Sequence, residues 1–202
     1  LDQYWRLTLD FLKIAREYWP AYLEETGRIE PAVRRDRLIE AEAARLATHH
    51  AGPVIAAGST GSMPSTARLL HVIATLPQGA VVLPGLDIDL DENAWQLIGG
   101  IRDKATGEFT SAPAAGHPQF ALHGLLARFG IARREIETLG GAPSGGREML
   151  TSEAMRPSNA TAQWHTRLAE PDVADRIASG MRNLAVIAAA NPEMEALAIA
   201  AA

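Results

Sequence analysis

A short polar loop is the first part of the sequence that could bind a ligand. It lies between a short apolar run and a helical pattern, and in open α/β sheets ligands bind at loops that follow strands. Backbone N–H groups at the start of the next helix also favour anions. A phosphate-binding P-loop needs a lysine after its second glycine, and this loop has none. We expect a tight turn in which Ser62 caps a helix starting at Pro64. The candidate ligand-binding residues are Gly58, Ser59, Thr60, Gly61, Ser62 and Asp87.

The same loop also has the spacing of a nucleophile elbow. Residues 57–61 are a small-residue variant of Gly-x-Ser-x-Gly, with Ser59 as the nucleophile. Asp87 and then His117 or His123 follow in the chain order of a hydrolase triad. Against this, the helix is expected only several residues after Ser59, and no His-Gly oxyanion segment precedes it. A serine hydrolase is the alternative hypothesis for function.

Three carboxylates alternate after the second predicted strand, at Asp87, Asp89 and Asp91. An EF-hand loop beginning at Asp87 would need glycine at its sixth position and glutamate at its twelfth, where Glu92 and Ile98 stand. Alternating acids could still hold Mg²⁺, but capping of a helix by Asp89 or Asp91 explains them more simply.

Other residue types give no catalytic or metal site. The chain has no cysteine, which excludes disulfides, thiolate zinc sites and cysteine nucleophiles. The six histidines show no tight ligand spacing, so we expect no metal and no cofactor. The tryptophans, which we expect in the core, are Trp5, Trp19, Trp95 and Trp164.

Charge argues against autonomous nucleic-acid binding. The 202 residues carry a net charge of −5, with 47% hydrophobic residues, whereas DNA-binding modules usually have a basic excess. One basic cluster, Arg34, Arg35 and Arg37, is a candidate nucleic-acid contact, and a solvated helix face is the simpler explanation. The chain has no secretory leader and its longest apolar stretch is too short for a membrane span. We expect a cytoplasmic protein, and the missing start and uncapped end suggest a piece of a longer one.

Hydrophobic periodicity predicts an α/β chain. A strand, loop, helix and strand within about 30 residues form a βαβ unit, which is parallel and right-handed. Residues 103–116 are a polar loop and the best candidate for mobility, 131–139 are a short strand or extended segment, and 140–146 are a glycine-rich connector. Strands are expected over residues 53–57, 80–83 and 184–190, and helices over 1–26, 31–48, 64–76, 91–101, 118–129, 147–155, 171–182 and 193–202.

Several of these stretches together resemble one family. Residues 54–67, 76–87 and 116–120, followed by 152–157 and 190–200, are similar to the AddB family of alphaproteobacterial double-strand-break repair subunits. The resemblance covers nearly the whole chain, with its matches in order.

The resemblance implies a role in the processing of broken DNA ends. Members of the family pair with an AddA-type subunit in a helicase–nuclease that resects ends for recombination. The chain would be an interior, helicase-like fragment with a degenerate, P-loop-like, parallel-sheet RecA-like segment and flanking helices. Its domains would be a helical region over 1–50, an α/β core over 51–139, and a helical connector over 140–202 that leads into a second α/β domain.

The catalytic groups of such an enzyme do not appear in this sequence. There is no Walker A lysine, Gly58 and Ser59 stand where acids would hold Mg²⁺, and no Asp–Glu–Lys nuclease block is present. We therefore expect no catalytic residues, and a role as scaffold and subunit contact with a DNA-guiding function through the parent complex.

Overall fold

The computed structural model describes residues 2–140 and 145–201. Contacts between Cα atoms divide the chain into two compact units: unit 1 is Leu1–Pro84 and unit 2 is Gly85–Ala202. Most elements are helical, and the described residues contain one parallel and one antiparallel pair of strands. No helix among them is both long enough and apolar enough to cross a membrane.

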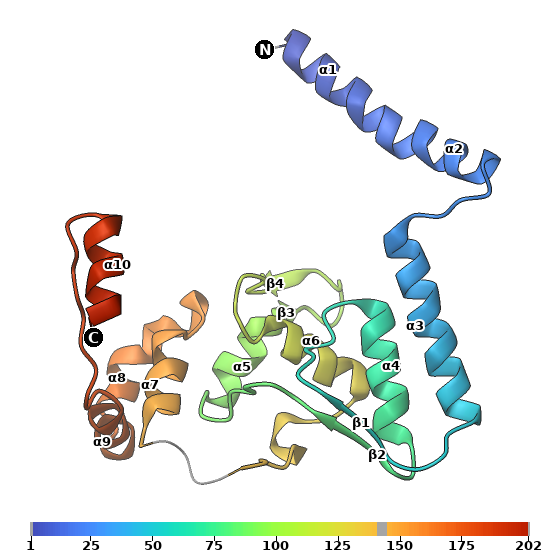
Figure 1. Cartoon of the computed structure of the whole chain (residues 1–202). Coiled ribbons are helices and arrows are strands. Elements are labelled where there is room, and N and C mark those ends of the chain that lie inside the picture. Colours follow the sequence, from blue (N-terminus) through green and yellow to red (C-terminus); the bar gives the residue numbers. More distant parts are fainter. Residues whose placement is uncertain (1, 141–144, 202) are drawn as a thin grey trace. The chain divides into compact units, whose positions relative to one another are not determined.

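Unit 1 begins with a continuous helical rod (Figure 1). It consists of α1 (Asp2–Lys13), the π-helical turn η1 (Ile14–Tyr18) and α2 (Trp19–Glu25), and it ends at Gly27, whose φ is +63°. The predicted helix over 1–26 is confirmed. The predicted core position of its tryptophans is wrong, because Trp5 is 57% exposed and Trp19 46% exposed. An amphipathic pattern identifies an apolar face without identifying what covers it.

The rest of unit 1 is a helix packed on a βαβ unit. Helix α3 (Pro31–Thr48) starts at the predicted proline, and it is followed by β1 (Val54–Ala57), α4 (Pro64–Thr75) and β2 (Gly79–Val82). The two strands pair in parallel, with Val54 opposite Gly79 and Ala57 opposite Val82. Buried apolar residues of α3 and α4 are Ala43, Leu46, Ala67, Leu70 and Ile73. Among the described residues, the predicted βαβ unit and its parallel pairing are therefore confirmed.

The sheet is covered less completely than expected. Residues of β1 alternate between half-buried and exposed, and Ile55 is 67% exposed. Parallel strands are normally buried on both faces, and this pair has helix α4 against it (Figure 1). Gly79 permits that contact, because a Cβ atom there would lie 1.8 Å from the carbonyl oxygen of Ile73 at the end of α4.

Unit 2 is a set of short helices and one hairpin. Helix α5 (Glu92–Gly99) and α6 (Phe120–Phe129) flank the hairpin of β3 (Ile101–Arg102) and β4 (Phe109–Ser111). Helix α6 ends at Gly130 in the left-handed conformation, as predicted, although it begins at Phe120 and not at Pro118. The buried core includes Leu90, Trp95, Ile98, Leu122, Leu125, Met149 and Val173.

The C-terminal part of unit 2 continues with short helices. The 3₁₀ turn η2 (Arg133–Glu135) precedes α7 (Arg147–Ala154), and the later elements are η3 (Ser158–Gln163), α8 (Trp164–Leu168), α9 (Pro171–Gly180) and α10 (Pro192–Ala201). Helices α7 and α9 approach closely at Gly146 and Gly180. A Cβ atom on Gly146 would lie 2.0 Å from the Arg176 carbonyl oxygen, and one on Gly180 would lie 2.5 Å from the Gly146 carbonyl oxygen.

Three predicted elements differ from the structure. Residues 103–116 contain β4, because Asp103 closes a turn by accepting the N–H groups of Ala105 and Thr106, both at 2.8 Å. Residues 131–139 contain the 3₁₀ turn Arg133–Glu135 and no strand, and residues 184–190 have no strand partner among the described residues. Part of the predicted connector, residues 141–144, lies outside the described residues.

Candidate functional site

The loop at residues 58–62 is held by one hydrogen bond to β2 and one within the loop. Gly58 donates its N–H to the Val82 carbonyl at 3.1 Å, and Gly61 donates its N–H to Ser59 Oγ at 3.3 Å. Both glycines have positive φ, +79° and +59°, which side chains rarely adopt. The Ser59 hydroxyl thus closes a short bend with Gly61, and Thr60 lies half-buried within it.

The predicted helix cap in this loop is wrong. Helix α4 begins at Pro64 as expected, but its N-cap residue is Met63, and no side chain accepts a hydrogen bond there. Ser62 is exposed. Proline fixes the first helical φ and has no N–H to satisfy, so the helix can begin without a polar cap.

The residues of the hydrolase hypothesis have other partners. Ser59 belongs to unit 1, whereas Asp87, His117 and His123 belong to unit 2. His117 Nε2 lies 2.7 Å from the Met155 carbonyl oxygen, and its Nδ1 accepts the Gln119 N–H at 3.1 Å. Both ring nitrogens of His117 are thus bound to backbone groups and are not free to accept a proton from a serine.

His123 is a packing residue. Its ring lies 5.1 Å from that of Trp95 and touches Gly99, where a Cβ atom would come within 2.2 Å of the imidazole. Burial lowers the pKa of His123, and the charge of Glu92 offsets this in part. The neutral ring fits an apolar contact with the indole better than a role in proton transfer.

The segment after β2, residues 85–91, is the most highly connected polar feature of unit 2; we call it the acidic turn. Asp87 Oδ1 accepts the N–H groups of Asp89 at 3.0 Å and Leu90 at 2.9 Å. Gln119 holds the start of the turn, donating to the Gly85 carbonyl at 2.9 Å and accepting the Asp87 N–H at 3.1 Å. The Asp87 carboxylate therefore shapes the backbone around it.

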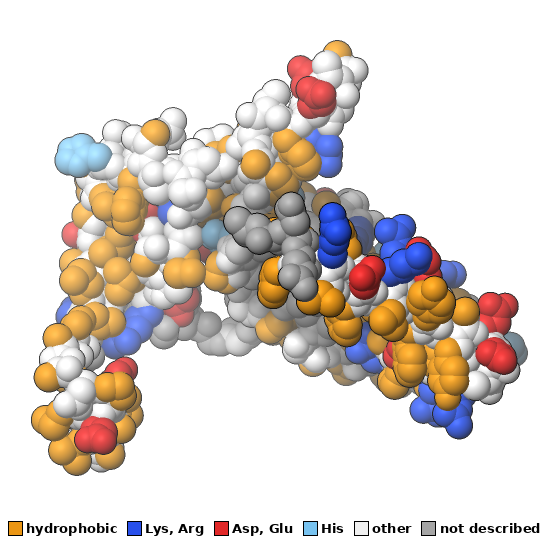
Figure 2. All heavy atoms as spheres, turned by 90° about the horizontal axis from the view of Figure 1, so that it is seen from above, with side chains coloured by type: hydrophobic (Ala, Val, Ile, Leu, Met, Phe, Trp, Pro, Cys, Tyr) orange, Lys and Arg blue, Asp and Glu red, His pale blue; other side chains and the backbone are white. Residues whose placement is uncertain are grey.

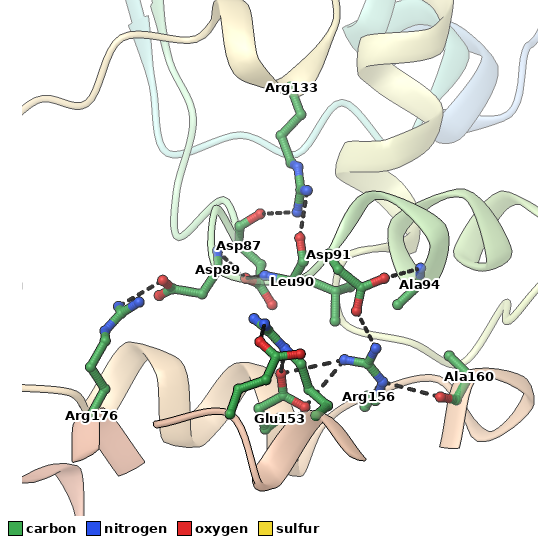
Figure 3. Close-up of polar contacts among 12 residues, drawn as sticks. Asp87, Asp89, Leu90, Asp91, Ala94, Arg133, Glu153, Arg156, Ala160 and Arg176 are labelled. Atoms are coloured by element: carbon green, nitrogen blue, oxygen red, sulfur yellow. Dashed lines mark hydrogen bonds and ion pairs between the residues drawn. The ribbon is translucent and has the colours of Figure 1, made fainter. Parts of the chain in front are cut away.

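Arg133 binds the backbone of the acidic turn from the side opposite to Arg156 and Arg176 (Figure 3). Arg133 donates to the Asp87 carbonyl at 2.8 Å and to the Leu90 carbonyl at 2.5 Å. Its side chain is 10% exposed, and its guanidinium lies 4.7 Å from the centre of the Trp95 ring. A planar guanidinium suits two carbonyls and an aromatic face at once.

Two further arginines neutralise the other acids of the turn. Arg176 of α9 pairs with Asp89 at 2.7 Å, and Arg156, just after α7, pairs with Asp91 (Figure 3). Asp91 also caps α5, accepting the Ala94 N–H at 3.0 Å, which confirms the predicted capping role. Burial alone would raise the pKa of Asp91, but the Ala94 N–H and the Arg156 guanidinium outweigh it, so this pKa is lowered.

Behind the acidic turn lies a buried ion cluster. Glu153 is 2% exposed and pairs with Arg156 at 3.2 Å and with Arg167 at 3.2 Å. Arg156, 3% exposed, also donates to the Ala160 carbonyl at 3.1 Å. Although burial lowers the pKa of Arg167, its hydrogen bonds to Glu153 and Glu170 outweigh that effect and raise it. Buried charges persist only when they are paired and hydrogen-bonded, and this cluster meets that condition.

This arrangement leaves the acidic turn poorly suited to a cation. Mg²⁺ binds through carboxylate oxygens in near-octahedral geometry, and here Asp89 and Asp91 pair with arginines while Asp87 accepts backbone N–H groups. Within residues 2–140 and 145–201, no three His, Asp or Glu side chains form a group that could hold a metal.

The basic cluster of α3 is a solvent-exposed face. Arg34, Arg35 and Arg37 are all exposed, and Arg35 pairs with its neighbour Asp36 at 3.3 Å. Asp36 also accepts a hydrogen bond from Ser65 Oγ of α4 at 3.1 Å, which links the two helices. The exposed guanidiniums are accessible to a phosphate without any rearrangement of the core.

Sequence reasoning missed most residues that organise this region. Asp87 was singled out, but the residues that bind it and its neighbours were not. The acidic turn is contacted from 32 to 87 residues further along the chain, by Gln119, Arg133, Arg156 and Arg176. No local spacing links them. The one available signal was the regular alternation of Asp87, Asp89 and Asp91. Carboxylates that are half-buried need cationic partners, and the turn itself contains none.

No family model matches this chain, and no curated protein or solved structure matches it either.

Proposed function

We propose that this chain is a non-catalytic, helicase-like segment of an AddB-type subunit that processes double-strand DNA breaks for recombinational repair. Its role is that of a scaffold that contacts an AddA-type partner subunit and guides DNA. The finer fold that this implies is a degenerate RecA-like segment, of which β1, α4 and β2 form one parallel βαβ step.

The observation that carries the proposal is a strand–loop–helix arrangement like that of nucleotide-binding sites, without the residues that bind and hydrolyse a nucleotide. A strand leads through a glycine-containing loop into a helix, as in RecA-like motors, yet residues 58–62 offer no lysine and no acid. The acids after the second strand are engaged by arginines or by backbone N–H groups. ATP hydrolysis requires a lysine on the phosphates and a carboxylate on Mg²⁺, so what remains is a framework.

Co-purification with an AddA-type subunit tests the scaffold role. We expect a stoichiometric complex on gel filtration, and isothermal titration of the chain alone with Mg²⁺-ATP should give no heat of binding. Failure to form the complex would contradict the subunit role. Saturable ATP binding at micromolar concentration would contradict the non-catalytic assignment.

The DNA-guiding role has its own test in the same complex. Replacing Arg34, Arg35 and Arg37 with glutamine removes three exposed positive charges. The expected result is weaker binding of single-stranded DNA and a shallower dependence of affinity on salt, since each phosphate contact releases counterions. The control replaces Arg45, which pairs with Glu42 at 2.6 Å. Equal affinity of the triple variant and the parent would remove the DNA-guiding role and leave the scaffold role intact.

A further inference from the structure

A histidine inside unit 2 has a hydrogen-bond partner at each of its two ring nitrogens. This residue is His117, which lies three positions before the start of α6. Exposed hydrophobic side chains also line the rod of unit 1, at the right of Figure 2, but nothing in the structure shows what covers them. The contacts of His117, in contrast, are all given by the structure and define one protonation state.

The partners of His117 fix the position of its proton. The backbone N–H of Gln119 lies 3.1 Å from Nδ1, and because an N–H can only donate, Nδ1 must carry a lone pair. Nε2 lies 2.7 Å from the carbonyl oxygen of Met155. A carbonyl oxygen can only accept, so Nε2 carries the proton. The folded chain therefore holds a neutral imidazole in a single tautomer.

Gln119 connects this ring to the acidic turn. Its side chain donates to the Gly85 carbonyl at 2.9 Å and accepts the Asp87 N–H at 3.1 Å. The backbone N–H of the same residue is the group that His117 holds. Met155, the partner of Nε2, is the C-cap residue of α7. One imidazole thus joins the start of α6 to the end of α7 and, through Gln119, to the acidic turn.

The surroundings of His117 offer nothing that would compensate a positive charge on its ring. Among the described residues, no carboxylate forms an ion pair with it. The acids of the acidic turn and Glu153 of α7 are engaged by backbone N–H groups or by arginines. Arg156 follows Met155 directly, and the N-terminus of α6 carries the positive end of the helix dipole. These neighbours favour the neutral ring.

We propose that His117 is a pH-sensitive latch, which holds the acidic turn to the start of α6 while its ring is neutral. A proton added at Nδ1 changes this nitrogen from an acceptor into a donor that faces the Gln119 N–H. That hydrogen bond is then lost, and the contacts of Gln119 with Gly85 and Asp87 weaken. The bond from Nε2 to Met155 persists, because this nitrogen keeps its proton. Histidine changes charge between about pH 5 and about pH 8, so mild acid loosens one end of the acidic turn.

Nuclear magnetic resonance of the 15N-labelled chain tests the latch directly. Long-range 1H–15N correlations distinguish the two ring nitrogens, and at neutral pH we expect a proton on Nε2 and none on Nδ1 of His117. Hydrogen exchange, corrected for the intrinsic effect of pH, then measures local opening. Between about pH 8 and about pH 5, the protection of the Gln119 and Asp87 amides should fall about tenfold more than that of Leu125 in the core of α6.

Two variants separate the latch from the other titrating ring of α6. In His117→Asn, Oδ1 stands as many bonds from the backbone as Nδ1 did and accepts an N–H as in an Asx-turn, but it takes up no proton. The protection of Gln119 should then no longer depend on pH. His123→Phe is the matched control and should leave that dependence in place.

Each of four results would overturn the latch. The first is a proton on Nδ1 of His117 at neutral pH in the parent chain, which needs no variant to fold. The second is a protection of Gln119 that falls only in parallel with that of Leu125. The others are a pH dependence that persists in His117→Asn, and one that disappears in His123→Phe.

Discussion

Glu153 and Arg156 form an ion pair that is shielded from water almost completely, with side chains 2% and 3% exposed and Oε2 and Nη1 3.2 Å apart. Arg156 extends the pair to Asp91 at the start of α5, and Arg167 completes the coordination of Glu153. The Arg156 guanidinium thus connects the start of α5 with Glu153 of α7.

Removal of that guanidinium should destabilise unit 2 strongly. Arg156→Met leaves Glu153 buried with only one of its two cations, Arg167, and breaking one side of a buried pair costs about 3–5 kcal/mol. Urea unfolding followed by circular dichroism measures the loss. Arg35→Met is the control, since its pair with Asp36 is exposed and should contribute less than about 1 kcal/mol. Equal effects of the two substitutions would contradict the buried network.

The contact between α4 and β2 should not tolerate a side chain at Gly79. Gly79→Ala places a Cβ atom 1.8 Å from the Ile73 carbonyl oxygen, and relieving such overlap costs about 1–3 kcal/mol or more. Gly124→Ala in α6 is the counterpart, because nothing lies within 4 Å of its added Cβ and alanine favours helix. Calorimetric melting should show a lower transition temperature for the first variant and an unchanged or higher one for the second.

Acidification should weaken unit 2 through His123. Its pKa is lowered in the folded state from the ordinary value of 6.5, so the unfolded chain takes up the proton first. The stabilisation is complete above that ordinary value and is lost as the pH falls through the folded pKa. His123→Phe retains the contact with Trp95 and removes the titration. The free energy of unfolding of this variant should fall less than that of the parent between neutral and mildly acidic pH, and parallel curves would refute the assignment.

Ser59 should not react as a hydrolase nucleophile. Its hydroxyl accepts the Gly61 N–H, and both nitrogens of His117 are bound to backbone groups. A fluorophosphonate probe should therefore leave the chain unlabelled. Labelling that disappears in Ser59→Ala would instead establish the hydrolase alternative.

Local sequence signals predicted the βαβ unit and several helix ends. Proline at the first helical position located the starts of α3 and α4, and Gly130 located the end of α6. These signals act through the φ angle of a single residue, which the residue type determines directly. Parallel pairing followed from the helix predicted between the two apolar runs, since a helical crossover returns the chain in the same direction.

Signals that depend on distant partners could not be read in this way. Residues 184–190 have the composition of a buried strand, yet Val186 is 88% exposed, because a strand needs a neighbour that composition does not supply. The arginines around the acidic turn come from three separate segments, and their pairing depends on the packing of α7 and α9. The role of Asp87 as a turn former, by contrast, is local, because its carboxylate accepts the N–H groups of Asp89 and Leu90, two and three residues further along.

The placement of the tryptophans has a practical consequence for spectroscopy. Trp5 and Trp19 of unit 1 already face water, whereas Trp95 of unit 2 is 4% exposed and lies under a guanidinium. Indole emission moves to longer wavelength when a buried ring becomes hydrated. The intrinsic fluorescence of this chain should therefore report the melting of unit 2 more strongly than that of unit 1.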